Sequence, residues 1–246
     1  MFIFYSPELD PQGLQISEGI PVEIPWILNR EESHHAVQVL RMEKGEKIQI
    51  LNGRGGLFLA ELERIDAKSC PVKILFFTQV PARKNKIHIV FSPTKNMDRI
   101  EWFLEKSTEI GVDEISFILC QNSERRILNE ERLSKILISA VKQSGQAYMP
   151  KINPLQPFLD FMKAPIQGMG MMAHCRDTHR TPFPDAFKNS STHNITVLIG
   201  PEGDFTEMEV EKSEEMGYIP ISLGEMRLRT ETAAILVCAQ FALLAS

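Results

Sequence analysis

Two short segments near the carboxyl end of the chain combine glycine with charged side chains in a way that could build a ligand site. The first, 198–205, reads LIGPEGDF, and the second, 223–233, reads LGEMRLRTETA. In each segment an apolar run ends at a glycine, and a helix-start signal follows within a few residues. We therefore expect two backbone loops at the ends of two strands, which is where ligands bind in open α/β sheets.

The side chains of these two loops indicate the chemistry. Gly200 and Gly203 would let backbone amides and carbonyls approach a ligand closely, and Glu202 would place a carboxylate beside it. Arg227 and Arg229 precede an apolar helix whose N-terminal dipole disfavours a nearby cation, so a negative or electron-rich partner is expected there. The alternative for the first loop is a plain strand-to-helix turn.

A second group of candidate residues lies in the first part of the chain. His34, His35 and Arg41 fall on an expected short helix, 33–41, and such side chains suit stacking and phosphate contact with RNA. The stretch 83–106 adds six basic residues against three acidic ones. The alternatives are that the paired histidines are surface or packing residues and that the basic stretch is an ordinary solvated face.

Several function classes lack their sequence signatures. There is no GxxxxGK[ST] loop for nucleotide triphosphates and no GxSxG elbow for an acyl-transfer serine. The glycines of 168–173 match GxGxxA in letters but precede an expected strand, so a nicotinamide cofactor is not indicated. His174, Cys175 and His179 lack the spacing of metal ligands, and we predict no metal site.

Composition places the chain among globular proteins of one large or two smaller domains. It has 246 residues, 43% of them hydrophobic and 24% charged, with a formal net charge of -5. This charge argues against a general nucleic-acid coat but allows a local basic face. The four scattered cysteines predict free thiols. No signal peptide or membrane span is recognised, and we expect a cytoplasmic protein.

The pattern of apolar residues changes part-way along the chain. Residues 1–78 predict a small β-barrel, with strands at 46–51, 57–65 and 72–77, and 79–86 reads as a linker. Residues 87–246 alternate strand and helix, which is typical of a parallel sheet with helices on both faces. Expected strands there are 87–91, 114–120, 169–174, 195–199 and 218–223. Asn96, Asn129 and Thr206 are the expected helix caps, and 230–245 is the last helix.

Four motifs together resemble one family. LIGPEGDF (198–205) and LGEMRLRTETA (223–233), with KSTEIGV (106–112) and HHAVQVLR (34–41), are similar to the 16S ribosomal RNA uridine N3-methyltransferases of the SPOUT superfamily. The resemblance covers essentially the whole chain. It implies a PUA-like β-barrel RNA-binding domain at 1–78 and a SPOUT α/β domain with a trefoil knot and a parallel sheet at 87–246. It also implies S-adenosylmethionine in the knot, 16S rRNA of the small ribosomal subunit as substrate, and a homodimer.

The resemblance also implies roles for individual residues. Arg229 would stabilise the uracil anion or fix a neighbouring phosphate, and either Glu202 or Glu231 would accept the uracil proton, a choice that stays open. Glu231 has the alternative of an ion pair with Arg229. The residues expected to hold the cofactor are Leu198, Gly200, Pro201, Gly203, Leu223, Gly224, Met226, Leu228 and Thr230. Those expected to contact RNA are His34, His35, Arg41, Lys95 and Arg99.

Three positions depart from the family pattern. Asp204 stands where the family has a glycine, Met226 begins a run that in the family begins with arginine, and Gln146 replaces another arginine. These departures leave two alternatives to the uridine methyltransferase. The chain could be a SPOUT methyltransferase that acts on another RNA, such as tRNA. It could also be a catalytically inactive RNA-binding assembly factor.

Overall fold

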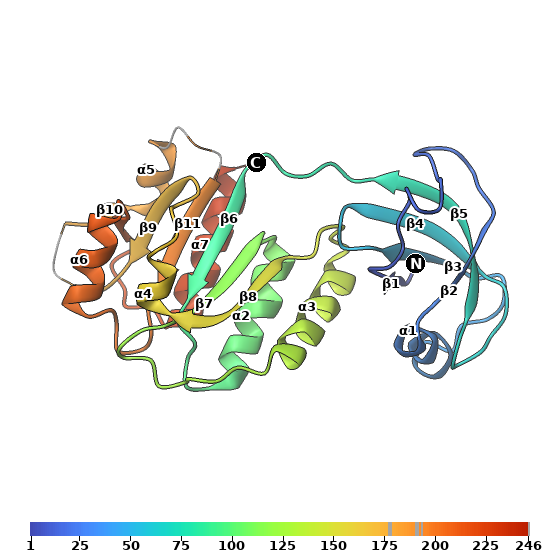
Figure 1. Ribbon diagram of the computed structural model, residues 1–246, viewed down its shortest axis with the longest axis horizontal. Helices are drawn as coiled ribbons and strands as arrows, with labels where there is room; N and C mark the ends of the chain where they lie inside the picture. Colours follow the sequence, from blue (N-terminus) through green and yellow to red (C-terminus); the bar gives the residue numbers. More distant parts are fainter. Residues whose placement is uncertain (177–178, 190–191, 193, 246) are drawn as a thin grey trace. The chain divides into compact units, whose positions relative to one another are not determined.

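The computed structural model describes residues 1–246 except 177–178, 190–191, 193 and 246. Packing divides the chain into two compact units, one formed by Met1–Ala82 with Val141–Met149 and the other by Arg83–Ala140 with Pro150–Ser246 (Figure 1). The return of 141–149 to the first unit was not indicated by the sequence. Val141 and Ala147 share a buried apolar cluster with Leu51, and the Gly55 amide donates to the Ala147 carbonyl at 2.9 Å. In addition, Lys142 Nζ lies 2.7 Å from a carboxylate oxygen of the buried Glu32.

The first unit is built on a five-stranded sheet with the order β1-β3-β4-β5-β2. Its strands are β1 (Ile3–Tyr5), β2 (Ile24–Ile27), β3 (Lys47–Leu51), β4 (Gly56–Leu62) and β5 (Pro71–Gln79). Phe58, Ala60 and Leu62 alternate along β4 and are fully buried, as their spacing predicts. Trp26 on β2 donates its indole N–H to Ser6 Oγ at 3.2 Å, which joins one edge strand to the residue that follows the other.

The expected helix at 33–41 begins earlier than predicted and changes type. It consists of α1 (Arg30–His34) and a π-helical turn, η1 (His35–Val39). The start moves because Asn29 caps the helix, with its Oδ1 accepting from the Glu32 amide at 2.9 Å. Arg41 then adopts a left-handed conformation, with φ of 54°, and ends the segment.

The second unit contains a seven-stranded sheet in which every strand pair is parallel, as predicted. The strand order is β10-β12-β9-β11-β6-β7-β8. Its strands are β6 (Lys86–Phe91), β7 (Glu114–Leu119), β8 (Lys151–Pro157), β9 (Met169–Ala173), β10 (Thr181–Pro182), β11 (Asn194–Ile199) and β12 (Ile219–Ser222).

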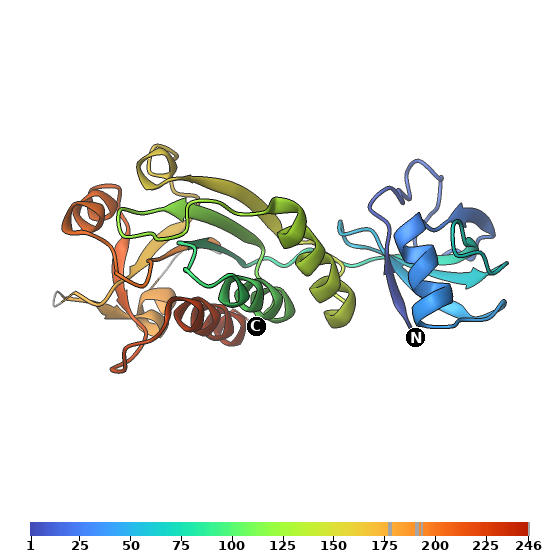
Figure 2. The same ribbon diagram turned by 90° about the horizontal axis from the view of Figure 1, so that it is seen from below.

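Helices cover both faces of this sheet. They are α2 (Met97–Ile110), α3 (Glu130–Ser144), α4 (Phe158–Phe161), α5 (Phe183–Lys188), α6 (Glu207–Glu215) and α7 (Thr230–Leu244). Helices α2 and α7 lie side by side on one face (Figure 2), and Phe158 of α4 and Val210 of α6 pack into the core on the other. Within the described chain, no helix is long and apolar enough to cross a membrane.

The predicted caps of α2, α3 and α6 are confirmed. Asn96 accepts from Asp98 N, Asn129 accepts from Arg132 N, and Thr206 forms a full capping box with Glu209. Strand β8 was missed because it contains two prolines and carries no period-two alternation, as suits its position at the sheet edge. The cysteines are free thiols, as expected, and only Cys175 is exposed.

Candidate active site

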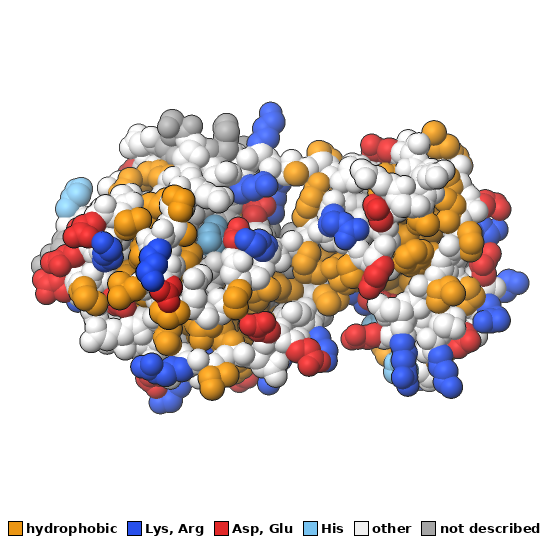
Figure 3. Space-filling model, in the orientation of Figure 1, with side chains coloured by type: hydrophobic (Ala, Val, Ile, Leu, Met, Phe, Trp, Pro, Cys, Tyr) orange, Lys and Arg blue, Asp and Glu red, His pale blue; other side chains and the backbone are white. Residues whose placement is uncertain are grey.

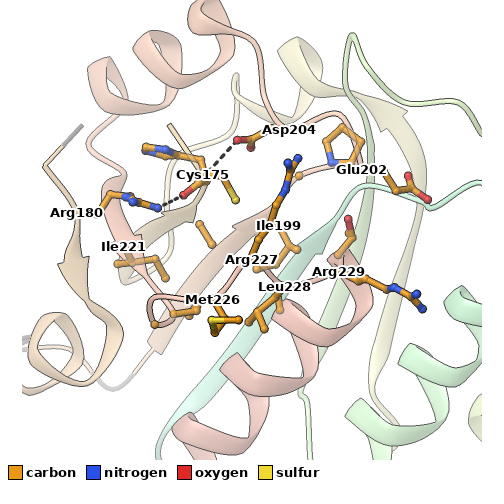
Figure 4. A pocket seen from close by; sticks show the side chains of 18 residues that line it. Cys175, Arg180, Ile199, Glu202, Asp204, Ile221, Met226, Arg227, Leu228 and Arg229 are labelled. Carbon is orange, nitrogen blue, oxygen red and sulfur yellow. Dashed lines mark hydrogen bonds between the residues drawn. The ribbon is translucent and has the colours of Figure 1, made fainter. Parts of the chain in front are cut away.

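The carboxyl ends of three neighbouring strands, together with the start of α7, enclose a pocket of about 380 Å³. Strand β9 contributes Ala173 and the residues after it, β11 contributes the loop from Ile199, and β12 contributes the loop from Ile221 (Figure 4). This is the edge at which ligands bind in open α/β sheets, since loops there leave backbone groups unpaired. Both segments singled out in the sequence therefore meet in one site.

Most of the residues predicted to hold a cofactor line this pocket. Gly200 and Pro201 line it from the first loop; Leu223, Gly224, Met226, Leu228 and Thr230 line it from the second. Leu198 does not, because strand alternation turns its side chain into the opposite core, where it is fully buried. Gly203 also lies outside the lining.

Glycine is required at Gly200 and at Gly224 for different physical reasons. A Cβ on Gly200 would lie 2.8 Å from Cε2 of Phe205, so this position is small because the buried Phe205 ring packs against it. The group that lies close to the Gly200 Cα is therefore the side chain of Phe205, which belongs to the core. Gly224 has open space around it but a φ of +125°, which side-chain-bearing residues rarely adopt. The second loop thus needs glycine for its backbone conformation.

Three charged side chains of the pocket are exposed. Arg229 is the N-cap residue of α7, and Figure 4 shows its side chain directed away from Met226 and Leu228. Arg227 extends instead toward the loop that carries Asp204 (Figure 4). Glu202 Oε1 accepts from the backbone N–H of Lys95 at 3.0 Å, which ties the loop after β6 to the loop after β11.

The third predicted catalytic residue, Glu231, is not in the pocket wall. Its side chain is buried on α7, and Oε1 lies 3.6 Å from Nε of Arg99 on α2. This ion pair replaces the expected pair with Arg229. Of the two carboxylates considered as proton acceptors, only Glu202 lines the pocket.

The strand end after β9 brings residues to the pocket that the sequence reasoning missed. His174, Cys175 and Arg180 line it, and Arg180 Nη1 donates to the His174 carbonyl at 2.8 Å. The burial of His174 lowers its pKa, which favours the neutral ring. The signal was available, since 169–174 was predicted as a strand and the rule about carboxyl ends applies to it equally.

Asp204 holds this missed segment in place. Its Oδ2 accepts from the Cys175 amide and its Oδ1 from the Phe205 amide, both at 2.8 Å. The residue has a φ of 63°, a left-handed conformation that aspartate tolerates better than most side chains. Where the resembled family has glycine, this chain therefore has a carboxylate that links two walls of the pocket.

The residues predicted to contact RNA are distributed over both units. In the first unit His34 and Arg41 are exposed, whereas the His35 ring lies edge-on to Phe4 at 6.1 Å and burial lowers its pKa. In the second unit Lys95 Nζ is 2.9 Å from Glu124. Acidic and basic side chains are interspersed over the visible face of each unit (Figure 3). Among the described residues, no group of three or more His, Cys, Asp or Glu could hold a metal ion.

Comparison with known proteins assigns both parts of the chain. Residues 81–242 match the RNA methyltransferase domain family, and residues 28–75 match the RNA methyltransferase PUA domain. The chain belongs to the RNA methyltransferase family. The confirmed resemblance covers the pocket, since both of its loops lie within 81–242.

Relatives within this family extend along nearly the whole chain. A ribosomal RNA small subunit methyltransferase E 2 from Borreliella burgdorferi is 31% identical over 85% of this chain and 86% of its own length. A probable rRNA-methyltransferase from Porphyromonas gingivalis is 36% identical, with a TM-score of 0.85 over 99% of this chain and 98% of its own. A methyltransferase from Legionella pneumophila, solved with S-adenosylmethionine, is 27% identical, with a TM-score of 0.83 over 98% and 97%.

Proposed function

We propose that this chain transfers a methyl group from S-adenosylmethionine to N3 of a specific uridine in 16S rRNA of the small ribosomal subunit. The observation that carries the proposal is the pocket at the carboxyl ends of β9, β11 and β12, in a chain whose structural relative was solved with that cofactor. The small-subunit rRNA substrate follows the names of its relatives. The uridine N3 position rests on the motif resemblance.

The pocket suits the cofactor in size and lining. Its volume of about 380 Å³ falls within the range of small-molecule sites, roughly 300–1,000 Å³. Ile199, Ile221 and Leu228 offer apolar contact for a purine ring, and the loops at Gly200 and Gly224 offer backbone donors and acceptors. Within the proposal these residues hold the adenosine part of the cofactor.

When bound, S-adenosylmethionine supplies a methyl group that is already activated, so the chain has to orient the base and manage the uracil proton. Uracil N3 is a poor nucleophile until that proton leaves. In the proposal Glu202 accepts the proton through a water molecule, because Glu202 lines the pocket and Glu231 is buried in its pair with Arg99. Arg229, exposed at the pocket rim, stabilises the resulting anion.

The substrate base has to be unpaired or turned out of its helix, since N3 is inaccessible inside a base pair. His34, His35 and Arg41 in the PUA domain, with Lys95 and Arg99, are proposed to hold the surrounding RNA. Because such contacts are electrostatic, activity should fall as salt concentration rises. A salt-independent rate would contradict this part of the proposal.

We further propose that the chain works as a homodimer with a trefoil knot around the cofactor loops. Helix α7 supports a dimer because it is apolar on most of its surface, and its Leu243 is 80% exposed. Sedimentation equilibrium would show twice the mass of 28.0 kDa. A monomer at micromolar concentration would refute the dimer.

Titration calorimetry with S-adenosylmethionine tests the cofactor pocket. Leu228→Asp places a charge on an apolar wall of the pocket and should reduce affinity by at least ~100-fold, because an unpaired carboxylate is costly where water is excluded. Ile127→Asp is the matched control, since Ile127 is 81% exposed and lies outside the lining. Equal affinity for both variants would place the cofactor elsewhere.

A further inference from the structure

A second hollow lies at the opposite edge of the same sheet, where the strands begin. It has a volume of about 520 Å³ and is bounded by the amino-terminal parts of β6, β7, β8 and β11. The helix that packs against β7 and β8 on this face is α4, which is only four residues long. Ligand sites in such sheets are expected at the carboxyl ends, so this hollow is not accounted for by the cofactor pocket.

The floor of the hollow is polar across four adjacent strands. The strand register places Thr196 of β11 beside His88 of β6, His88 beside Glu114 of β7, and Glu114 beside Lys151 of β8. In the next row toward the carboxyl ends, Met172, Leu198 and Val90 are buried in the core, and the row continues with the polar residues Ser116 and Asn153. The face of a parallel sheet is normally apolar, so this group of polar residues is a local exception.

These polar groups are prearranged by hydrogen bonds. Asn153 Nδ2 donates to Glu114 Oε1 at 2.6 Å and to Ser116 Oγ at 2.8 Å, and Ser116 Oγ lies 2.8 Å from His88 Nε2. Burial lowers the pKa of His88 to about 4, so the imidazole is neutral at pH 7. A hydroxyl that accepts from Asn153 can donate its own proton to Nε2, which leaves an N–H donor on Nδ1 of His88.

The side chains on the floor of the hollow are too buried to belong to an ordinary solvent-exposed face of the sheet. Ser116 is 1% exposed, Thr196 is 4% exposed and Tyr218 is 5% exposed. The side chains of Thr196 and Tyr218 line the hollow. Among the described residues, neither hydroxyl belongs to the buried polar atoms that lack a hydrogen-bond partner. A ligand in the hollow would meet both hydroxyls as neutral donors and acceptors.

Charge and shape restrict the ligand class. The carboxylates Glu114 and Asp160 are paired with Lys151 and Lys163, so the hollow has no concentrated positive charge for a phosphate. Its other wall is apolar and includes Phe161, Pro165 and Ile166, which fits a flat ring. Neutral donors and acceptors facing an aromatic wall are the usual means by which proteins recognise an unstacked base.

We propose that this hollow binds an unpaired nucleobase, presented either by RNA or as a free nucleoside. Thr196, Tyr218 and His88 supply the hydrogen bonds to the edge of the base, and Phe161 supplies an apolar contact for its ring. The site is separate from the cofactor pocket and would hold a base other than the one that is methylated.

Amide and imidazole NMR shifts test this proposal. The protein is saturated with S-adenosylhomocysteine, which occupies the cofactor pocket, and is titrated with each of the four ribonucleosides to about 5 mM, where weak binding is visible. Shifts centred on His88, Thr196 and Tyr218 are expected. Ribose 5-phosphate, which lacks a base, should produce none. A single-stranded RNA that competes with the nucleoside would identify RNA as the source of the base.

A matched pair of variants completes the test. Thr196→Val keeps the shape and removes the hydroxyl, and should weaken nucleoside binding at least ~5-fold. Thr78→Val, on β5 of the other unit, should leave it unchanged. Absence of shifts with every nucleoside and with RNA, equal shifts with ribose 5-phosphate, or an unaffected Thr196→Val would overturn the proposal. Binding of S-adenosylhomocysteine in the same samples reports separately on the cofactor site.

Discussion

Asp204 allows the sharpest test of how the pocket is held together, because this chain has a carboxylate where the resembled family has glycine. The carboxylate accepts the Cys175 and Phe205 amides at 2.8 Å and so links the segment after β9 to the loop after β11. Asp204→Asn retains one oxygen acceptor and loses the other, whereas Asp204→Gly loses both and keeps the positive φ accessible.

The expected magnitude follows from these two bonds. A hydrogen bond to a charged group contributes roughly 1.5–3 kcal/mol, and partial exposure of Asp204 reduces this to about 1–1.5 kcal/mol for each bond. If the segment must be ordered to bind the cofactor, that energy is subtracted from binding. Asp204→Asn should then weaken S-adenosylmethionine binding by roughly tenfold, and Asp204→Gly by roughly 30-fold or more.

Calorimetry and hydrogen exchange at the Cys175 amide are the assays. Asp66→Asn is the control, since Asp66 also accepts a backbone amide, that of Lys68 at 2.9 Å, but does not line the pocket. The control should bind within about twofold of wild type. Faster exchange at Cys175 with unchanged affinity would show that the segment does not limit binding. Unchanged exchange would show that the two hydrogen bonds do not hold the segment, and either result refutes the reasoning.

Three other changes have defined outcomes. Arg229→Ala should lower kcat by roughly 10²-fold or more while cofactor affinity stays unchanged, and full turnover would exclude Arg229 as the anion-stabilising group. The pKa of His88 is about 4 in the folded protein against 6.5 for a free imidazole, so its neutral form stabilises the fold above pH 6.5 and this stability is lost as the pH falls toward 4. Urea unfolding at pH 5 and 7.5 should therefore show a pH-dependent loss about 2 kcal/mol larger in wild type than in His88→Gln, and equal losses would contradict the shift. Glu209→Ala should lower the free energy of unfolding by about 3 kcal/mol, because the Gln121 and Thr206 amides lose their acceptor. Glu207→Ala, an exposed position in the same turn, should lower it by under ~1 kcal/mol, and similar losses would mean that Glu209 does not hold these groups.

The sequence predicted the parallel sheet and most of its helices because the signals were local. Capping residues such as Asn96 and Thr206 act within one turn, and the apolar alternation of β4 needs only neighbouring residues. The return of 141–149 to the first unit was missed because it depends on contacts between residues far apart in the sequence, such as the packing of Val141 with Leu51 and the pairing of Lys142 with Glu32, 110 residues away. No local pattern encodes such a contact.

The site was predicted in outline for the same reason. Glycines and charged residues identified the loops after β11 and β12 as two walls of the pocket. The third wall, after β9, could be recognised only from the pairing of β9 with β11 and β12. Gly200 was interpreted as space for a ligand, and the space is taken by the Phe205 ring, which lies five residues along the chain. Glu231 was a plausible catalytic carboxylate until helix packing placed it against Arg99.

Methyl transfer to ribosomal RNA tests the central claim most directly. The purified chain is incubated with labelled S-adenosylmethionine and small ribosomal subunits that lack the modification, and the labelled nucleotide is located by mass spectrometry. We predict a single N3-methyluridine in the 16S rRNA. Label on another RNA or another base atom, or no transfer by a chain that binds the cofactor, would contradict the proposed function.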